Sequence, residues 1–197
     1  MGTTEQNQAA LPGVLQRIGW EHKNMAKLLD LLERHVAVFE RDGETDYDLI
    51  DALVEYFRRF PDACHHPKED LIFARLKERN PAAATAVGDL PQEHEDLIGK
   101  TETLAGVIDN ILKEVGVPRE DFERTAHGFI DAQRAHMRME SERFFPAALA
   151  ALSSEDWSEI DARVDDPDDP VFGSARQERF EALRAQILEW DEEEASG

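Results

Sequence analysis

The chain has 197 residues, of which 41% are hydrophobic and 33% are charged, and this length and composition fit one folded domain with an appendage. The formal net charge of −21 argues against nucleic acid or an anionic membrane as a partner, because phosphate binding requires clustered Lys and Arg. No apolar run approaches the roughly 18–20 residues that span a bilayer. The first 13 residues lack the basic flank and apolar run of a signal peptide, and the single cysteine, Cys64, excludes an internal disulfide. We therefore expect a cytoplasmic protein without a membrane partner.

Two long helices are predicted in the first half of the chain. The first runs from about residue 14 to residue 41 and ends at the Asp42-Gly43 step. The second starts near residue 46 and ends near Asn80-Pro81. Within it, Pro61 and Pro67 interrupt the apolar pattern, because proline lacks the backbone donor of a helix interior. We expect a kink or a short break there, just before a pair of histidines.

Two further helices complete the predicted core. The third starts near Pro91, which suits the first turn of a helix, and ends near Gly116. The fourth begins after Val117 with Pro118 and an acidic first turn, and it continues to about Leu152. Apolar residues recur about every three to four positions along these segments. With short connections, the four helices predict an all-α fold, an up-down-up-down four-helix bundle over residues 1–152 with its core at about 14–152.

Residues 153–197 form a predicted C-terminal helical extension. Ser153 to Asp156 are suited to cap a short helix that carries Trp157 and Ile160. The acidic, proline-containing stretch 165–170 predicts a rigid linker or loop. A last amphipathic helix follows, and we expect it to pack on the bundle or on a second copy of the chain, as in a homodimer; its apolar residues are Phe180, Leu183, Ile187, Leu188 and Trp190.

Each predicted core helix carries a histidine in line with its apolar residues, and two of these are followed four residues later by a glutamate. Four residues turn a helix by about 400°, so both side chains of such a pair leave the same face. Non-haem iron accepts imidazole and carboxylate ligands, and a carboxylate can bridge two cations about 3.5–4 Å apart. Ligation also removes the cost of burying so many ionisable groups. The predicted metal ligands are His22, His65, Glu69, His94, His136 and Glu140.

Taken singly, these residues have simpler interpretations, since a lone histidine on an apolar stripe is more often a hydrogen-bonded core residue and a lone glutamate is usually exposed. Their joint occurrence on four helices favours the metal site. His35 is rotated by about 220° from His22, and His127 by about 180° from His136, so both are expected at the surface. His66 lies about 60° from Glu69, near the same face, and is a candidate seventh ligand.

Residues 65–73 and 136–146 resemble the two signature segments of hemerythrin-like (HHE cation-binding) domains. Glu21-His22 and Glu93-His94 resemble the single-histidine segments of the same family, in the same order. The resemblance covers about residues 14–152. It implies a bundle with a non-haem diiron centre in which the four histidines are terminal ligands and the two glutamates bridge the irons. It also implies chemistry with O2, NO, peroxide or iron itself.

The chain departs from oxygen-carrying hemerythrins at Leu90, where those proteins carry a further histidine four residues before the third-helix ligand. Glu140 follows His136 by four residues, as in the HHE relatives, and not by five. With a bridging oxo or hydroxo group, each iron would then have five ligands and an open position. If His66 also binds, one iron becomes six-coordinate and the other stays open.

Several functions remain open at this point. We favour a protein that binds or senses O2, NO or iron. The alternative is a diiron redox enzyme acting on peroxide or NO. Tyr56 and Cys64 are candidate electron donors for such an enzyme, although core packing and an inert thiol are the favoured interpretations of these two residues. A third possibility is a helical interaction protein whose site is empty or filled by zinc. Iron content separates the third class from the first two.

Overall fold

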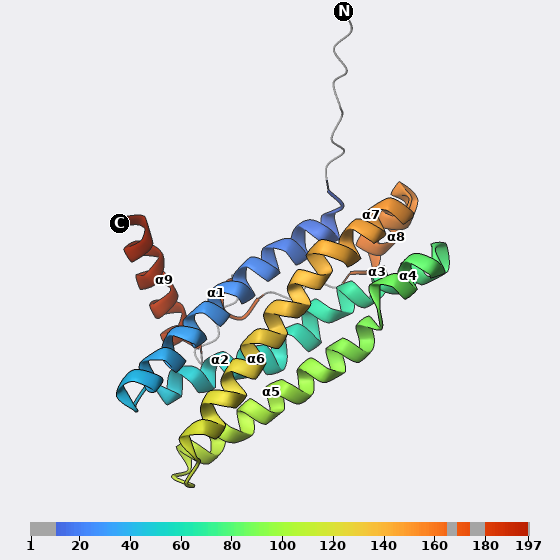
Figure 1. Ribbon diagram of the computed structural model, residues 1–197. Helices are drawn as coiled ribbons and strands as arrows, with labels where there is room; N and C mark the ends of the chain where they lie inside the picture. The colour runs from blue at the N-terminus through green and yellow to red at the C-terminus, as the bar shows by residue number, and fades with distance from the viewer. Residues whose placement is uncertain (1–10, 165–168, 174–179, 197) are drawn as a thin grey trace, which may run out of the picture.

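The computed structural model describes residues 11–164, 169–173 and 180–196, with side chains up to residue 189. All regular structure within these residues is helical, so the fold class is all-α as predicted (Figure 1). Among the described helices, none is both apolar and long enough to cross a membrane.

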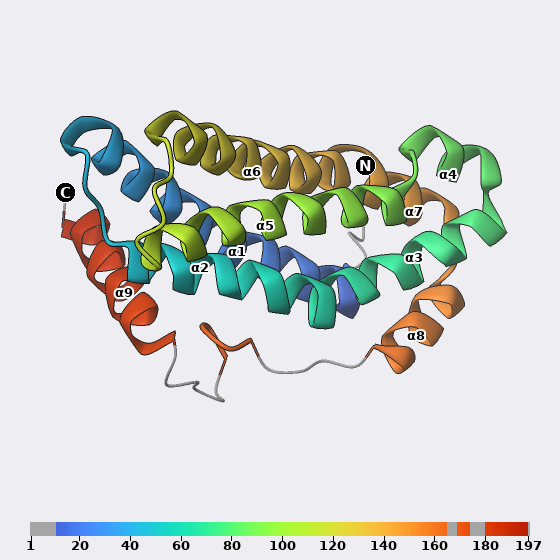
Figure 2. The same cartoon turned by 90° about the horizontal axis from the view of Figure 1, so that it is seen from below.

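Four rods of helix lie side by side along the bundle (Figures 1 and 2). The first rod is α1 (Gly13–Asp42), and the third is α5 (Leu90–Leu112). The second and fourth rods are each built of two α-helices joined by a π-helical turn. They are α2 (Tyr47–Phe60), η1 (Pro61–His65) and α3 (His66–Arg79), and α6 (Arg119–Met139), η2 (Glu140–Phe144) and α7 (Phe145–Ala151). Helix α5 packs on α2 and α6, and α6 also packs on α1, as in an up-down-up-down bundle.

Local signals explain where the first two rods end and begin. Gly43 takes a left-handed φ of 78°, and its amide donates to the carbonyl of Phe39 to close α1. Such a conformation suits glycine, so the predicted end at Asp42-Gly43 is confirmed. The Asp46 carboxylate accepts from the Leu49 amide and starts α2, since this satisfies a donor that has no helical partner.

The predicted interruption of the second rod is a π-helical turn. The His66 amide donates to the carbonyl of Pro61, five residues back, so the turn holds one more residue than an α-helical turn. The fourth rod contains a second turn of this kind, in which the Phe145 amide donates to the carbonyl of Glu140. Sequence analysis did not anticipate this second turn, which lies just before Pro146.

One predicted boundary needs correction, and one helix was not predicted. The second rod ends at Arg79, near the predicted Asn80-Pro81, but the segment after it contains α4 (Pro81–Val87), which is capped by Asn80 and starts with a proline. The third rod ends at Leu112 and not near Gly116, and Glu114 just beyond takes a left-handed φ of 57°. A backbone conformation of this kind cannot continue an α-helix.

The apolar core falls into two clusters at the two ends of the bundle. One cluster joins α1, α2, α5 and α6, and the other joins the start of α1 with α3, α4, α7 and the short helix α8 (Ser154–Arg163). On each rod, the predicted metal-binding residues fall between the segment in one cluster and the segment in the other. The polar centre is therefore enclosed by apolar packing on both sides.

The two helices of the extension lie at opposite ends of the bundle (Figure 2). Helix α8 begins with the predicted Ser153–Asp156 capping box and contacts α1 and α3. Helix α9 (Glu181–Ser196) contacts α1 and α2, and Leu183 and Ile187 are buried in the core while Leu188 is exposed. The linker residues 165–168 and the side chain of Trp190 lie outside the described residues.

Candidate metal centre

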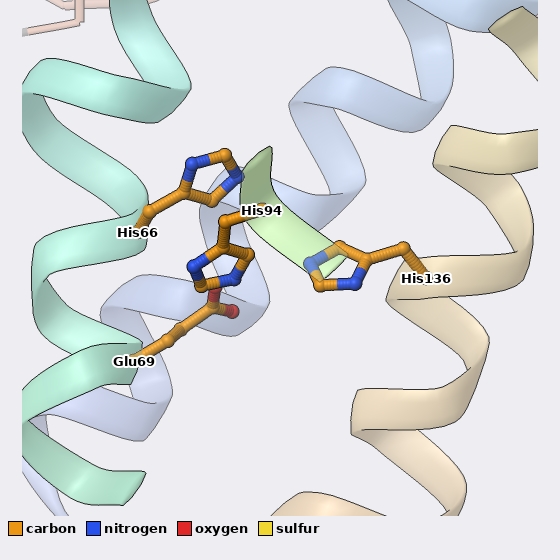
Figure 3. Close-up of side chains that lie close together, drawn as sticks. All are labelled: His66, Glu69, His94 and His136. Carbon is orange, nitrogen blue, oxygen red and sulfur yellow. The ribbon is translucent and has the colours of Figure 1, made fainter. Parts of the chain in front are cut away.

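All four rods contribute side chains to one buried polar centre. The contributions come from α1, from η1 and α3, from α5, and from the junction of α6 and η2. Figure 3 shows side chains from three of these rods pointing toward one another. Glu69 and Glu140 are completely buried, and every histidine of the set is at most 9% exposed. The structure thus brings together all seven residues singled out in the sequence: His22, His65, His66, Glu69, His94, His136 and Glu140.

These residues form two adjoining groups, each able to hold one cation. In each group the nitrogen and oxygen atoms that would bind a metal lie within 4.8 Å of one another. The first group is His22, His65, Glu69 and Glu140; the second group is His66, Glu69, His94 and His136. Glu69 belongs to both groups, and His66 belongs to the second although its sequence neighbour His65 belongs to the first.

Glu69 presents one carboxylate oxygen to each group. Its Oε1 lies 3.2 Å from Nε2 of His65, and its Oε2 lies 3.4 Å from Nε2 of His94. Glu140 is arranged in the same way, with Oε2 3.2 Å from Nε2 of His22 and Oε1 3.2 Å from Nε2 of His136. Each of the two carboxylates thus extends toward both groups, and a carboxylate placed in this way can bridge two neighbouring cations.

Several of these buried atoms approach one another without hydrogen-bond geometry. Both oxygens of Glu69 and of Glu140 lack a hydrogen-bond partner, and so does Nε2 of His94 and of His136. Leaving buried polar atoms unsatisfied is costly, and native structures rarely do so without a reason. Imidazole nitrogens and carboxylate oxygens are good ligands for a divalent transition metal. The residues present therefore fit a pair of cations.

A second layer of carboxylates orients the imidazole rings. Nδ1 of His65 lies 2.7 Å from Oε2 of Glu21, and the three histidines of the second group each have a carboxylate 3.2–3.3 Å from Nδ1. A partner on Nδ1 fixes the tautomer, so that Nε2 is free to face a metal. In the second group, His66 pairs with Asp62 and His136 pairs with Glu93, whereas Asp70 lies 3.3 Å from Nδ1 of His94 without hydrogen-bond geometry.

Sequence reasoning did not assign these outer carboxylates. The Asp62–His66 pair could have been found, because residues four apart meet on a helix. Glu21 and Glu93 each bond a histidine of another rod, and no spacing along the chain reveals such a pairing. Lys68 was also missed, although it is buried and forms an ion pair with Glu21.

Electrostatics set the protonation of the metal-free centre. Burial by itself would lower the pKa of His65, but the Glu69 charge and the bond to Glu21 outweigh it and raise the pKa to about 10. Burial likewise lowers the pKa of His94, but the nearby carboxylates of Asp70 and Glu69 outweigh it and raise the pKa to about 9. By contrast, burial and the neighbouring His94 lower the pKa of His66 to about 2, which keeps this imidazole neutral.

The remaining ligand candidates follow the same logic. Burial is again the largest influence on His22 and on His136, yet the adjacent Glu140 carboxylate raises the pKa of both. Burial would raise the pKa of Glu69, but the surrounding histidines, His65 first, hold it well below its usual range. A cation entering this centre would displace protons from imidazoles, so binding and pH are coupled.

Other chemically notable side chains lie outside the two groups. His35 contacts Thr45 and Gln186, and His127 contacts Glu40, in agreement with the helical angles that excluded both from the centre. Cys64 is half-buried against the core. Tyr56 is fully buried, and its hydroxyl donates to Asp169.

The fold and this centre together define a helical-bundle protein built to bind cations. A family model described as Hemerythrin HHE cation binding domain matches residues 15–148, which is more than half of the chain. The chain belongs to this family, as the signature segments indicated. The match ends before α8, so the C-terminal extension lies outside it. Comparisons with curated proteins and with solved structures found no match.

Proposed function

We propose that this protein holds two non-haem iron ions, bridged by Glu69, Glu140 and an oxo or hydroxo group, and that it binds or senses O2, NO or iron through them. The observation that carries the proposal is the pair of adjoining His/Glu groups that share Glu69, in which four carboxylate oxygens are buried without a hydrogen-bond partner. Membership of a cation-binding family supports it independently.

The proposed ligand sets are unequal. His22 and His65 would serve one ion, and His66, His94 and His136 would serve the other, in line with the two groups. His66 thereby supplies the imidazole that Leu90 does not, and the low pKa of His66 keeps its nitrogens available at neutral pH. Iron held this way would supply reversible electron transfer and the ability to bind a diatomic ligand.

The surrounding residues favour a small ligand. Three surface cavities of about 370, 340 and 390 Å³ are lined by residues other than the seven of the centre. The centre itself is buried between two apolar clusters, and each of its seven residues is at most 9% exposed. The burial of the centre therefore favours a small ligand such as O2 or NO over a large organic substrate.

The second candidate is a diiron redox enzyme acting on peroxide or NO. The observation that favours it is the buried Tyr56, whose hydroxyl is held 2.9 Å from the Asp169 carboxylate. A phenol with a carboxylate acceptor beside it is able to give up a proton together with an electron. This function predicts catalytic consumption of the substrate, whereas binding or sensing predicts a stable, reversible adduct.

The proposal is tested first by metal content. Anaerobic loading with Fe²⁺ should give about two irons per chain, as in other bundles with paired carboxylate sites. The variants His22→Ala and His94→Ala should each lose iron, whereas His35→Ala and His127→Ala, which remove histidines outside the centre, should keep both ions. Iron-free protein, or protein that takes up only zinc, would refute the proposal.

Stopped-flow mixing then separates the two candidates. Reduced, loaded protein is mixed with O2, NO and peroxide in turn, and the absorbance is followed. A one-to-one adduct that reverses when the ligand is removed supports binding or sensing. Continued consumption of peroxide or NO over many equivalents supports the enzyme.

A further inference from the structure

Part of the C-terminal extension is anchored deep in the bundle through an aspartate. We name residues 169–173 the C-terminal strap. Asp169 is only 3% exposed, although its sequence context is an acidic linker. Its carboxylate accepts from the Tyr56 hydroxyl at 2.9 Å and from the backbone amides of Val171 at 2.8 Å and Phe172 at 2.9 Å. The strap is therefore a specifically bonded element.

Two aromatic and polar contacts hold the strap against neighbouring helices. The Phe172 ring meets Trp20 of α1 edge to face, with ring centroids 6.4 Å apart. From α9, Arg184 Nη1 donates to the carbonyl of Val171 at 3.1 Å. Val171 itself is buried in the apolar cluster that joins α1, α2, α5 and α6. The strap thus bridges α9, α2 and α1.

This bridge lies on the flank of the centre that carries His65. Trp20 directly precedes Glu21, whose carboxylate holds Nδ1 of His65 and pairs with the buried Lys68. Burial is the largest influence on Asp169 and raises its pKa, against the hydrogen bonds from Phe172, Val171 and Tyr56, which lower it. On this flank, the second layer of the centre is shielded from water.

The opposite flank is open. The outer carboxylates of the second group are half in solvent, since the side chains of Asp62, Asp70 and Glu93 are 48%, 49% and 40% exposed. The corresponding side chain of the first group, Glu21, is 4% exposed. The outer carboxylates of the two cation positions therefore differ in their access to water, whereas the imidazoles of both positions are buried.

We infer that the C-terminal strap seals the first cation position, that of His22 and His65, so that its ion exchanges slowly while the ion at the second position exchanges quickly. This inference rests on the proposed two-cation centre. Asp169 is the anchor of the seal, because its carboxylate joins the strap's own backbone to Tyr56 of the bundle. Loss of this carboxylate would free the strap from α2 and admit water and chelator to the sealed flank.

The test measures how fast the ions leave. Full-length protein loaded anaerobically with two Fe²⁺ is mixed with excess bipyridine, and the coloured complex is followed over time. The wild type should release one equivalent in a fast phase and one in a slow phase. Asp169→Ala should accelerate the slow phase at least tenfold and leave the fast phase unchanged. Tyr56→Phe, which removes only the hydroxyl, should accelerate the same phase to a smaller degree.

A matched control comes from the other extension helix. Asp161 of α8 accepts from the amides of Gly13 and Val14 and so ties α8 to α1 away from the strap. Asp161→Ala should leave both phases unchanged. If Asp169→Ala does not fold, as judged by circular dichroism, Asp169→Asn and Tyr56→Phe provide the same comparison.

The outcomes separate this inference from the proposed function. Release of both irons in a single phase by the wild type, or a slow phase that Asp169→Ala and Tyr56→Phe leave unaltered, would overturn the seal while the content of two irons still supports the proposed function. Protein that binds no iron at all would refute both the seal and the proposed function. Acceleration confined to the slow phase of the strap variants supports the seal.

Discussion

His65 and His66 are neighbours along the chain, yet they face different cation positions. Adjacent residues in an α-helix point about 100° apart, so both can turn inward only where the cavity is wide. Here His65 ends the π-helical turn and His66 starts α3, and their rings contribute to separate groups with Glu69 between them. Whether His66 binds a cation can therefore be tested by substituting this one residue.

We predict that His66→Ala weakens the binding of one of the two irons at least tenfold, since loss of partners around a metal site typically costs about 10–100-fold in affinity. The charge-transfer absorbance of the O2 adduct should shift as well, because the coordination of one ion changes. Iron titration and absorbance spectroscopy measure the two effects. His35→Ala is the control. Unchanged affinity and spectra in His66→Ala would exclude His66 as a ligand.

At this scale, the inward ligands were accessible from sequence, and their outer partners mostly were not. Spacing of four residues marks His65 with Glu69 and His136 with Glu140, because a helix repeats its faces at that interval. Glu21 bonds His65 from another rod, and this contact depends on how α1 packs against the second rod. The burial of Lys68 could not be predicted either, because lysine is almost never fully buried without a partner and its partner, Glu21, lies on another rod.

The π-helical turns are the elements that shape the centre. Each inserts one extra residue into a rod at the level of the metal-binding side chains, one ending at His65 and the other starting at Glu140. Short π-helical turns of this kind are often found at functional sites. A rod without the extra residue would present its later side chains at a different angle.

We predict that deleting Ala63, an exposed residue of η1, converts the turn to α-helix and abolishes the binding of at least one cation. One residue turns a helix by about 100°, so the deletion rotates the residues before the turn relative to Glu69 and the residues after it. Circular dichroism should show the helix content retained, and metal analysis should show the loss. Deleting Gly116, in the loop between α5 and α6, should leave two ions bound; equal metal content in both deletions would contradict the prediction.

The prolines of the sequence predicted the position of one π-helical turn but not its type. Pro61 predicted an interruption of the second rod, and the structure has one there, but a missing donor does not by itself distinguish a kink, a break and a π-helical turn. The turn at Glu140 precedes Pro146 and was not predicted. Helix α4 was also missed, although Asn80 followed by Pro81 is a recognisable start signal.

For the whole molecule, the main consequence is a cluster of ionisable groups enclosed between two apolar clusters. In the metal-free protein the pKa of His65 is raised to about 10 and that of His94 to about 9, from an ordinary 6.5. A raised pKa means that the folded state binds the proton more tightly than the unfolded state does. This contribution to stability is complete below pH 6.5 and is lost as the pH rises through about 9 to 10.

We therefore predict that the Tm of the metal-free protein, held in a chelator, falls as the pH is raised from about 7 to 10. His66 does not offset this trend, because its lowered pKa affects stability only below pH 6.5. Differential scanning calorimetry at several pH values measures the effect. Metal-loaded protein is the comparison, and its Tm should not fall in step, because its imidazoles carry metal and not protons. A level Tm across this range in the metal-free protein would contradict the prediction.

The sequence by itself determined the all-α class, the residue ranges of the four rods to within a few residues, and the set of histidines and glutamates that face inward. Helical periodicity makes this possible, because it relates positions along one segment of the chain to one face of a helix. Only the tertiary structure decided which histidine belongs to which cation position, that Glu21 of another rod orients His65, and that Asp169 of an acidic linker is buried against Tyr56. These features depend on the angles and distances between separate rods. The packing of the two apolar clusters and the π-helical turns set these angles and distances, and the spacing of residues along one helix does not predict them.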